Sequence, residues 1–312
     1  MNGNGHETTC CVVLNWNLPD LTVRCVQALV ADGVPANRIV VVDNGSTDGS
    51  PDLLDRELPD CRHVRLPENI GFARASNAGA RELEADTYVF VNNDAFVASA
   101  GSVARLVEAL GHPGVGVAVP RLVNEDGTLQ RNVVPLSTPV TAVIRATGLS
   151  RFLPDSLQPR FSTHWNHESS RYIDAANGAV LAVGGDTWRA LGGYVERAWM
   201  YSEDLDLCWR ARKLGRKIWF ERGSEFMHLG NASGSMVYTD VMRAELVSLS
   251  DGQMIRSELG PVRGRATIGI LCLGLLVRTA VFAATGQRAG ARWALAGVRG
   301  YLKRPPATPA RS

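Results

Sequence analysis

The stretch TYVFVNND at residues 87–94 is an apolar, β-like run that ends in two amides and a carboxylate. Two similar runs precede it, CCVVLNW at 10–16 and RIVVVDN at 38–44, and both also end in polar residues. Segments with apolar residues at helical spacing separate these runs. Strands that alternate with helices in this way predict an α/β fold, built on a mixed, mostly parallel sheet with helices on both faces.

Length and composition indicate a folded protein. The 312 residues are 45% hydrophobic and 21% charged, which is enough apolar material for a large buried core. The six cysteines include no C-x-x-C pair, so we expect small core residues in a reducing compartment and no zinc site. The polar N-terminus shows no secretory signal, which favours the cytoplasm, and no nucleic-acid partner is expected.

The C-terminal part differs from the rest in charge. Residues 261–312 contain nine basic and no acidic residues, which leaves 24 basic against 31 acidic residues before them. Residues 267–277 are uncharged, and eleven residues are too few to span a bilayer, which needs about 20. We therefore expect a helical basic tail over 246–312 whose segment 261–312 lies on an anionic membrane surface. The alternatives are a helix that spans the membrane over 266–285, with Arg278 near its end, and a helix buried against the body.

Polar residues follow two of the predicted strands. Asp43 ends the run at 38–43, where ligand clefts of α/β proteins form, and it could accept hydrogen bonds from a base or a ribose. Asp94 could bind Mg²⁺ or Mn²⁺ against a diphosphate, because these ions keep waters and need few protein carboxylates. Turn chemistry alone would explain both sequences equally well.

A second acidic cluster begins a predicted helix at 204–214. Glu203, Asp204 and Asp206 are three carboxylates in four residues, more than helix capping needs. Neighbouring like charges raise one another's pKa, which suits a general base. Asp206 is predicted to be structural and to pair with Arg210.

Other ligand classes lack their motifs here. No G-x-G-x-x-G follows the first strand and no G-x-x-x-x-G-K-[ST] occurs, so a nicotinamide or P-loop site is disfavoured. A sugar-1-phosphate nucleotidyltransferase would carry a glycine-rich basic loop after the first strand, where residues 15–20 read NWNLPD.

An ordered set of motifs over about residues 9–235 resembles glycosyltransferase family 2, of the GT-A fold, and its bacterial rhamnosyltransferase-like branch. The motifs are VDNGSTDGS at 42–50, ENIGFA at 68–73, NAG at 77–79, NND at 92–94, NGA at 177–179, LGGY at 191–194, MYSEDLDLCWR at 200–210 and His228.

The resemblance implies a GT-A catalytic domain over 8–245, with a nucleotide-sugar-binding half at 8–120 and an acceptor-binding half at 121–245. It also implies roles for individual residues. Asp204 would be the catalytic base, and Asp94 with His228 would hold Mg²⁺ or Mn²⁺. Amides at 92 and 93 replace acids that are frequent in the family, so Asp94 would carry the metal almost alone. Nucleotide-sugar contacts are expected from Asn15, Asp43, Asn69, Asn77 and Asn93, and acceptor contacts from Glu203 and Trp199.

The implied activity is an inverting transfer of L-rhamnose or a similar hexose in cell-surface polysaccharide synthesis. The donor would be dTDP-rhamnose or a UDP-sugar, and the acceptor a hydroxyl of a glycan or of a polyprenyl-diphosphate-linked saccharide. The expected location is cytoplasmic, peripheral at the inner face of the cell membrane. A soluble secondary-metabolite acceptor and a catalytically silent scaffold or binding subunit of the same fold are the alternatives.

Overall fold

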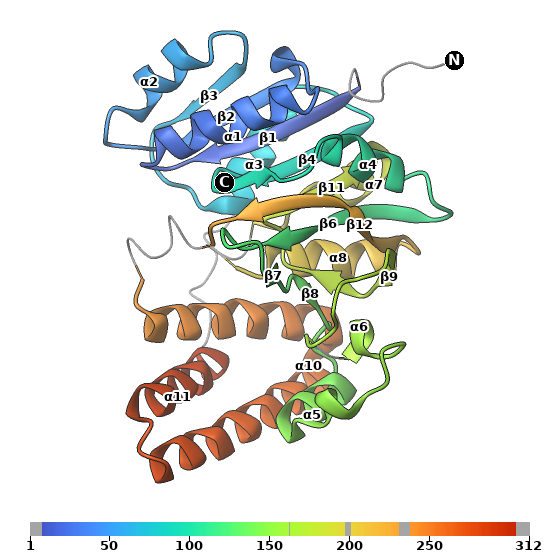
Figure 1. The fold of residues 1–312 in the computed structure, drawn as a ribbon. Coiled ribbons are helices and arrows are strands. Elements are labelled where there is room, and N and C mark those ends of the chain that lie inside the picture. The colour runs from blue at the N-terminus through green and yellow to red at the C-terminus, as the bar shows by residue number, and fades with distance from the viewer. Residues whose placement is uncertain (1–7, 162, 197–200, 231–237, 304–312) are drawn as a thin grey trace.

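The computed structural model describes residues 8–161, 163–196, 201–230 and 238–303 (Figure 1). The first part forms β1 (Thr9–Asn15), α1 (Pro19–Ala31), η1 (Ala36–Arg38), β2 (Ile39–Asn44), α2 (Ser50–Glu57), β3 (Arg62–Leu66), α3 (Phe72–Arg81), β4 (Thr87–Asn92), β5 (Ala95–Val97), α4 (Ser102–Ala109) and β6 (Val115–Val123). There follow β7 (Leu129–Gln130), β8 (Val133–Val134), α5 (Pro139–Thr147), η2 (Leu149–Phe152), α6 (Gln158–Phe161), β9 (Arg171–Ile173), β10 (Ala175–Ala176), β11 (Val180–Gly184), α7 (Gly185–Leu191), α8 (Glu203–Lys213), β12 (Lys217–His228), α10 (Asp240–Ala284) and α11 (Arg288–Leu302).

The main sheet is mixed, as predicted. Its strands follow the order β3-β2-β1-β4-β11-β6-β12-β5, and the pairs β3-β2, β2-β1, β1-β4 and β6-β12 are parallel. β11 lies antiparallel between β4 and β6 and so joins the two parallel groups. The sequence did not predict this insertion, because β11 reads as an ordinary buried strand.

Two hydrophobic cores cover the two faces of the sheet. Alternate residues of one strand enter different cores: Cys10 and Val12 pack with α3, α7 and α8, whereas Cys11 and Val13 pack with α1, α2 and α4. Because both faces are covered, the central strands read as continuous apolar runs. The prediction of helices on both faces is therefore confirmed, and Figure 1 shows the helices around the sheet.

The carboxyl ends of the parallel strands meet at one edge. Asn15 at the end of β1 lies in register with Asp43 of β2, and Leu14 lies in register with Asn92 of β4. Val180 at the start of β11 pairs with Val91 beside them. Polar residues that follow three different strands are thus collected at one place.

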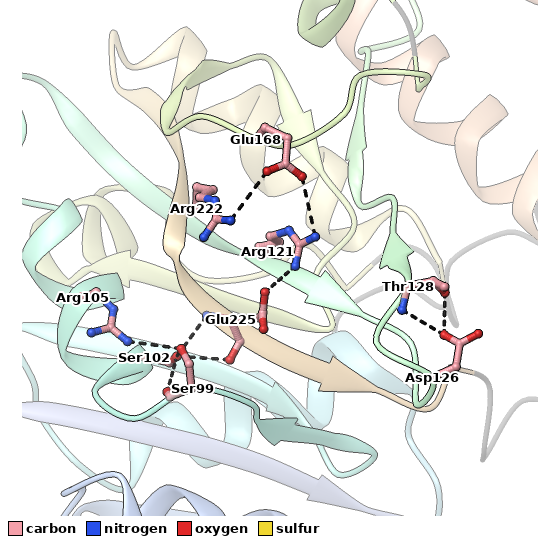
Figure 2. Close-up of polar contacts among 9 residues, drawn as sticks. All are labelled: Ser99, Ser102, Arg105, Arg121, Asp126, Thr128, Glu168, Arg222 and Glu225. Atoms are coloured by element: carbon pink, nitrogen blue, oxygen red, sulfur yellow. Dashed lines mark hydrogen bonds and ion pairs between the residues drawn. The ribbon is translucent and has the colours of Figure 1, made fainter.

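Ion pairs and a serine fix β12, the strand that ends in His228 (Figure 2). Arg121 of β6 pairs with Glu225 of β12 and, at 3.8 Å, with Glu168, which lies between α6 and β9. The Ser102 hydroxyl at the start of α4 accepts a hydrogen bond from the Glu225 backbone N–H at 3.0 Å. These contacts connect β12 to its neighbouring strand β6 and to helix α4.

The C-terminal part is a helical layer below the sheet (Figure 1). α10 begins at Asp240, before the expected boundary at 246, and kinks at Gly260 (φ 73°), the residue before Pro261. Its second half packs against α5 and α11 in a small core of its own, whose members include Ala142, Ile268 and Val298. Within the described residues α10 alone is long and apolar enough to cross a membrane, by length and composition.

Candidate active site

A pocket of about 670 Å³ lies at the carboxyl-end edge of the sheet. Both acidic clusters reach it, although about a hundred residues separate them in the chain. Seven of the predicted site residues line it: Asn15, Asn69, Asn93, Asp94, Glu203, Asp204 and His228. Asp43 stands directly behind this lining, Asn77 lies elsewhere, and Trp199 is outside the described residues.

Buried amides and hydroxyls connect the ends of three elements on the expected donor side. The Asn15 amide donates to Asp43 Oδ1 at 2.8 Å, and Asn15 Oδ1 accepts from the Thr22 hydroxyl at 2.8 Å. The Asn93 amide donates to that same hydroxyl at 3.0 Å. Asp43 also accepts the backbone N–H of Ser46 at 3.1 Å. Sequence reasoning missed Thr22, because its full burial is visible only in the structure.

A second contact holds the loop after β2 against the loop before α3. The Asn44 amide donates to Asn69 Oδ1 at 3.1 Å, and Asn44 Oδ1 accepts from the Ile70 N–H at 3.0 Å. Gly45 permits this approach: its φ is 72°, and a Cβ there would lie 2.2 Å from the Glu68 carbonyl carbon. The turn sequence is therefore required by packing as well as by backbone conformation.

Asn77 does not reach the pocket. Its amide donates to the Tyr194 carbonyl at 2.9 Å and to Glu196 at 3.0 Å, and its Oδ1 accepts from the Tyr194 N–H at 2.9 Å. Through these hydrogen bonds the Asn77 amide holds the turn after α7. The structure thus gives Asn77 a role in fixing that turn, in place of the nucleotide contact expected from the motif.

His228 and Asp94 form a pair at the floor of the pocket, with His228 Nε2 3.2 Å from Asp94 Oδ1. Gln130 determines which ring nitrogen carries hydrogen. Its amide nitrogen donates to the His228 carbonyl at 3.1 Å and to Asn124 Oδ1 at 3.0 Å, so its Oε1 faces His228 Nδ1 at 2.6 Å and accepts from it. In neutral His228 the lone pair on Nε2 is then directed at a carboxylate oxygen.

Such a donor set fits a hard divalent cation. A carboxylate oxygen and an imidazole nitrogen at this separation repel one another unless a proton or a metal ion lies close to both. Elsewhere in the described ranges no third His, Cys, Asp or Glu joins them, so water and substrate phosphate would have to supply the remaining ligands. Gln130 could not be predicted from motif spacing, because it lies 98 residues before His228.

The turn before Gln130 is itself braced (Figure 2). The Thr128 backbone N–H and hydroxyl both bond to Asp126 Oδ1, at 2.9 and 2.6 Å. The Asn124 amide donates to the Thr128 hydroxyl at 2.9 Å. Because Asn124 also accepts from Gln130, this turn helps to orient the amide that contacts His228.

Glu203 and Asp204 at the start of α8 form another part of the pocket wall. Tyr201 and Ser202 precede them with positive φ of 72° and 66°, an unfavourable conformation for residues other than glycine. The Gly178 backbone N–H donates to Asp204 Oδ2 at 2.5 Å. A Cβ at Gly178 would lie 3.1 Å from the Asp204 carboxyl carbon, so this wall also depends on glycine.

Burial raises the pKa of both carboxyls. The pKa of Glu203 is raised well above its usual range, first by desolvation and then by the charge of Asp204. Hydrogen bonds to the ionised form, including that from Gly178, partly oppose the rise in the pKa of Asp204. The charge of Asp204 raises the pKa of Glu203, as predicted for neighbouring carboxylates, but desolvation is the larger cause of the rise at both residues.

The structural role predicted for Asp206 is confirmed. Its carboxylate lies 2.7 Å from Arg210 Nε one turn later, and Arg210 also donates to the Leu191 and Gly193 carbonyls. α8 is thereby fixed to the end of α7, and the two carboxylates at its start are positioned over the pocket.

Comparison with known proteins agrees with this architecture. Residues 10–163 match the family model described as "Glycosyl transferase family 2". The chain carries a family 2 glycosyltransferase domain. The match covers β1 to α6 and includes the whole sheet edge that holds Asp43 and Asp94.

Two curated relatives extend the similarity of this glycosyltransferase domain. The chain is 28% identical over 205 residues to "N-acetylglucosaminyl-diphospho-decaprenol L-rhamnosyltransferase" from Mycobacterium tuberculosis, which covers 61% of this chain and 66% of the relative, just under two thirds. It is 25% identical over 223 residues to "O-antigen biosynthesis protein RfbC" from Myxococcus xanthus, across 69% of this chain and 17% of that protein.

Solved structures confirm the GT-A fold. A mannosyltransferase from Pyrobaculum calidifontis, in complex with GDP-Man and Mn²⁺, superposes with a TM-score of 0.61 at 16% identity over 95% of this chain and 87% of its own. GalNAc-T7 with UDP, GalNAc and Mn²⁺ gives a TM-score of 0.51 at 16% identity, over 78% of this chain and 48% of its own. Identities this low establish the fold alone.

Proposed function

We propose that this protein is an inverting glycosyltransferase that moves L-rhamnose or a similar hexose from a dTDP- or UDP-linked donor to an acceptor hydroxyl. One observation carries the proposal: a single pocket brings the Asp94–His228 pair and the carboxylate of Asp204 together from distant parts of the chain. A metal-binding pair and a potential base within one pocket are what a direct displacement at the sugar requires.

On the donor side Asp94 and His228 would hold Mg²⁺ or Mn²⁺, which neutralises the charge that develops on the departing diphosphate. Both compared solved structures contain Mn²⁺, which favours a divalent metal. The nucleoside would lie against the edge built by Asn15, Asp43 and Asn69, and Asn93 would contact the donor beside Asp94. Their hydrogen bonds with one another keep this edge rigid before the donor arrives.

On the acceptor side Asp204 would accept the proton of the attacking hydroxyl. Its raised pKa makes it a better base than an exposed aspartate, while the Gly178 N–H keeps it ionised and oriented. General-base assistance is typically worth about 10²–10⁴-fold in rate. Glu203 retains its proton to higher pH and would donate a hydrogen bond to the acceptor.

The acceptor we infer is a polyprenyl-diphosphate-linked saccharide of cell-surface polysaccharide synthesis, with the enzyme at the cytoplasmic face of the membrane. The similarity to a rhamnosyltransferase whose name specifies a diphospho-decaprenol substrate supports this class. The acid-free basic segment at 261–312 supports an anionic surface nearby.

Thermal shift with a panel of nucleotide sugars, in Mn²⁺ or in EDTA, tests the donor site. We expect one donor to stabilise the protein in a metal-dependent manner. An Asp204→Asn variant should keep this shift and lose transfer by about 10²-fold or more. Glu203→Gln is the matched neighbour and should lose less. Donor binding without turnover in the wild type would indicate the scaffold alternative, and turnover by Asp204→Asn near the wild-type rate would refute the base assignment.

A further inference from the structure

The second half of α10 leaves one apolar face without a partner in the described part of the chain. Val262, Leu273 and Val277 are 76%, 64% and 55% exposed, and Leu276 and Val281 are 47% and 55% exposed. Their spacing along the helix places them on one side, opposite the buried Ile268, Leu271 and Cys272. Single exposed apolar residues are ordinary, but a stripe along several turns is not.

The segment between β8 and β9, which contains α5 and η2, adds further exposed apolar residues. α5 exposes Val140 (60%) and Val143 (44%), and η2 exposes Leu149 (51%) and Phe152 (77%). α5 packs closely on α10, since a Cβ at Gly274 would lie 2.8 Å from the Ala146 methyl group. Figure 1 shows α5 beside the second half of α10, at the end of the molecule away from the first three strands. We call these nine residues the docking face.

The charges around the docking face have one sign. Residues 127–154 and 259–312 contain no Asp or Glu, although they come from different parts of the sequence. Arg151, Arg263, Arg265 and Arg278 belong to these segments and are exposed. An apolar face on two segments whose charged side chains are all cations complements an anionic lipid surface, where acyl chains accept the apolar groups and headgroups attract the arginines.

We propose that the docking face rests on the surface of an anionic lipid bilayer, with η2 as a second membrane contact beside the tail. The proposal rests on the proposed function, because a lipid-linked acceptor would require such a surface. α10 connects the two sites: Val247 in its first half lines the catalytic pocket, and its second half carries the docking face.

The buried side of the C-terminal layer indicates that it lies along the surface and does not cross the bilayer. The Tyr301 hydroxyl of α11 donates to Asp251 of α10 at 2.6 Å, and the Ser137 hydroxyl before α5 donates to the same carboxylate at 3.3 Å. A crossing helix would have to leave these polar partners behind and take Arg278 into the hydrocarbon.

Co-sedimentation of the full chain with vesicles tests the proposal without any substrate. Vesicles of phosphatidylcholine with phosphatidylglycerol should bind the protein, and pure phosphatidylcholine should bind it at least tenfold more weakly. The variant Phe152→Ser with Leu273→Gln should lose at least about tenfold in vesicle affinity. The control Leu214→Gln removes a leucine of similar exposure (50%) from the end of α8 and should bind as the wild type does.

A charge variant tests the same face with little effect on folding. Arg151→Glu should weaken binding to anionic vesicles by about fivefold or more and reduce its salt sensitivity. Equal binding of all variants would overturn the proposal, as would equal binding to both kinds of vesicle. Resistance to alkaline carbonate extraction would also overturn it in favour of a crossing helix. A dimer that the Phe152→Ser, Leu273→Gln variant abolishes would identify a second copy as the occupant. Because donor-induced thermal shifts are measured without vesicles, failure of the proposed function would be recognised separately.

Discussion

Replacing Gln130 by methionine should weaken metal binding although Gln130 is not expected to touch the metal. Methionine has a similar length, but its thioether sulfur is only a weak acceptor for the Nδ1–H hydrogen bond, which is 2.6 Å long with Gln130. His228 could then rotate and place its hydrogen on Nε2, the nitrogen that faces Asp94 at 3.2 Å. Gln130 thus acts as a positioning residue for the Asp94–His228 pair.

The size of this effect follows from two contributions. A hydrogen bond of this kind contributes about 0.5–1.5 kcal/mol. Holding the ring in one orientation spares up to about 1 kcal/mol of side-chain entropy when the metal binds. The sum, about 0.5–2.5 kcal/mol, corresponds to about 2- to 70-fold in metal affinity.

The assay is a titration with Mn²⁺ followed by the electron paramagnetic resonance of the free ion, with UDP or dTDP present. Gln130→Glu keeps an acceptor for Nδ1 and should retain the wild-type affinity or exceed it. His228→Ala defines complete loss of the imidazole ligand. If Gln130→Met binds Mn²⁺ within twofold of the wild type while its melting temperature is unchanged, the tautomer argument is wrong. If the wild type itself binds no Mn²⁺, the metal assignment fails instead.

Three further predictions concern the frame of the site. Gly45→Ala should lower the free energy of unfolding by about 3 kcal/mol or more in urea titrations, because a backbone clash adds to the unfavourable φ. The control Gly49→Ala has a similar φ of 81° but open space around it, and it should lower the free energy of unfolding by only about 1 kcal/mol. Asp206→Asn should cost about 3 kcal/mol by leaving the guanidinium of Arg210 without its buried partner, and a cost below about 1 kcal/mol would contradict that role. Glu203 has a raised pKa in the folded state, so its ionisation opposes folding, and stability should fall as pH rises through that pKa. Glu203→Gln should therefore be more stable than the wild type at neutral and alkaline pH but not at pH 4, which thermal unfolding across pH will show.

Local patterns were sufficient for much of the fold and of the site. Apolar runs ending in polar residues predicted the strands that carry Asp43 and Asp94, since a strand buried on both faces needs a continuous apolar sequence. The helix predicted from residue 204 lies within one residue of α8, which starts at Glu203, and the pairing of Asp206 with Arg210 was also predicted, because both depend on residues within one or two helical turns. Motifs in the expected order then gave the family, and the comparison confirmed it.

The tertiary structure decided every feature that joins distant segments. Three features join segments whose sequences give no sign that they are in contact. They are the antiparallel insertion of β11, the hydrogen bond between Gln130 and His228, and the hydrogen bonds of Asn77 to the turn at Tyr194. The docking face also depends on the tertiary structure. The exposed apolar residues of α5 and α10 are brought together only because the two helices pack against each other. A sequence records which side of an element avoids water, and that is a local property. Which element covers that side depends on how the whole chain closes upon itself, and that only the folded structure shows.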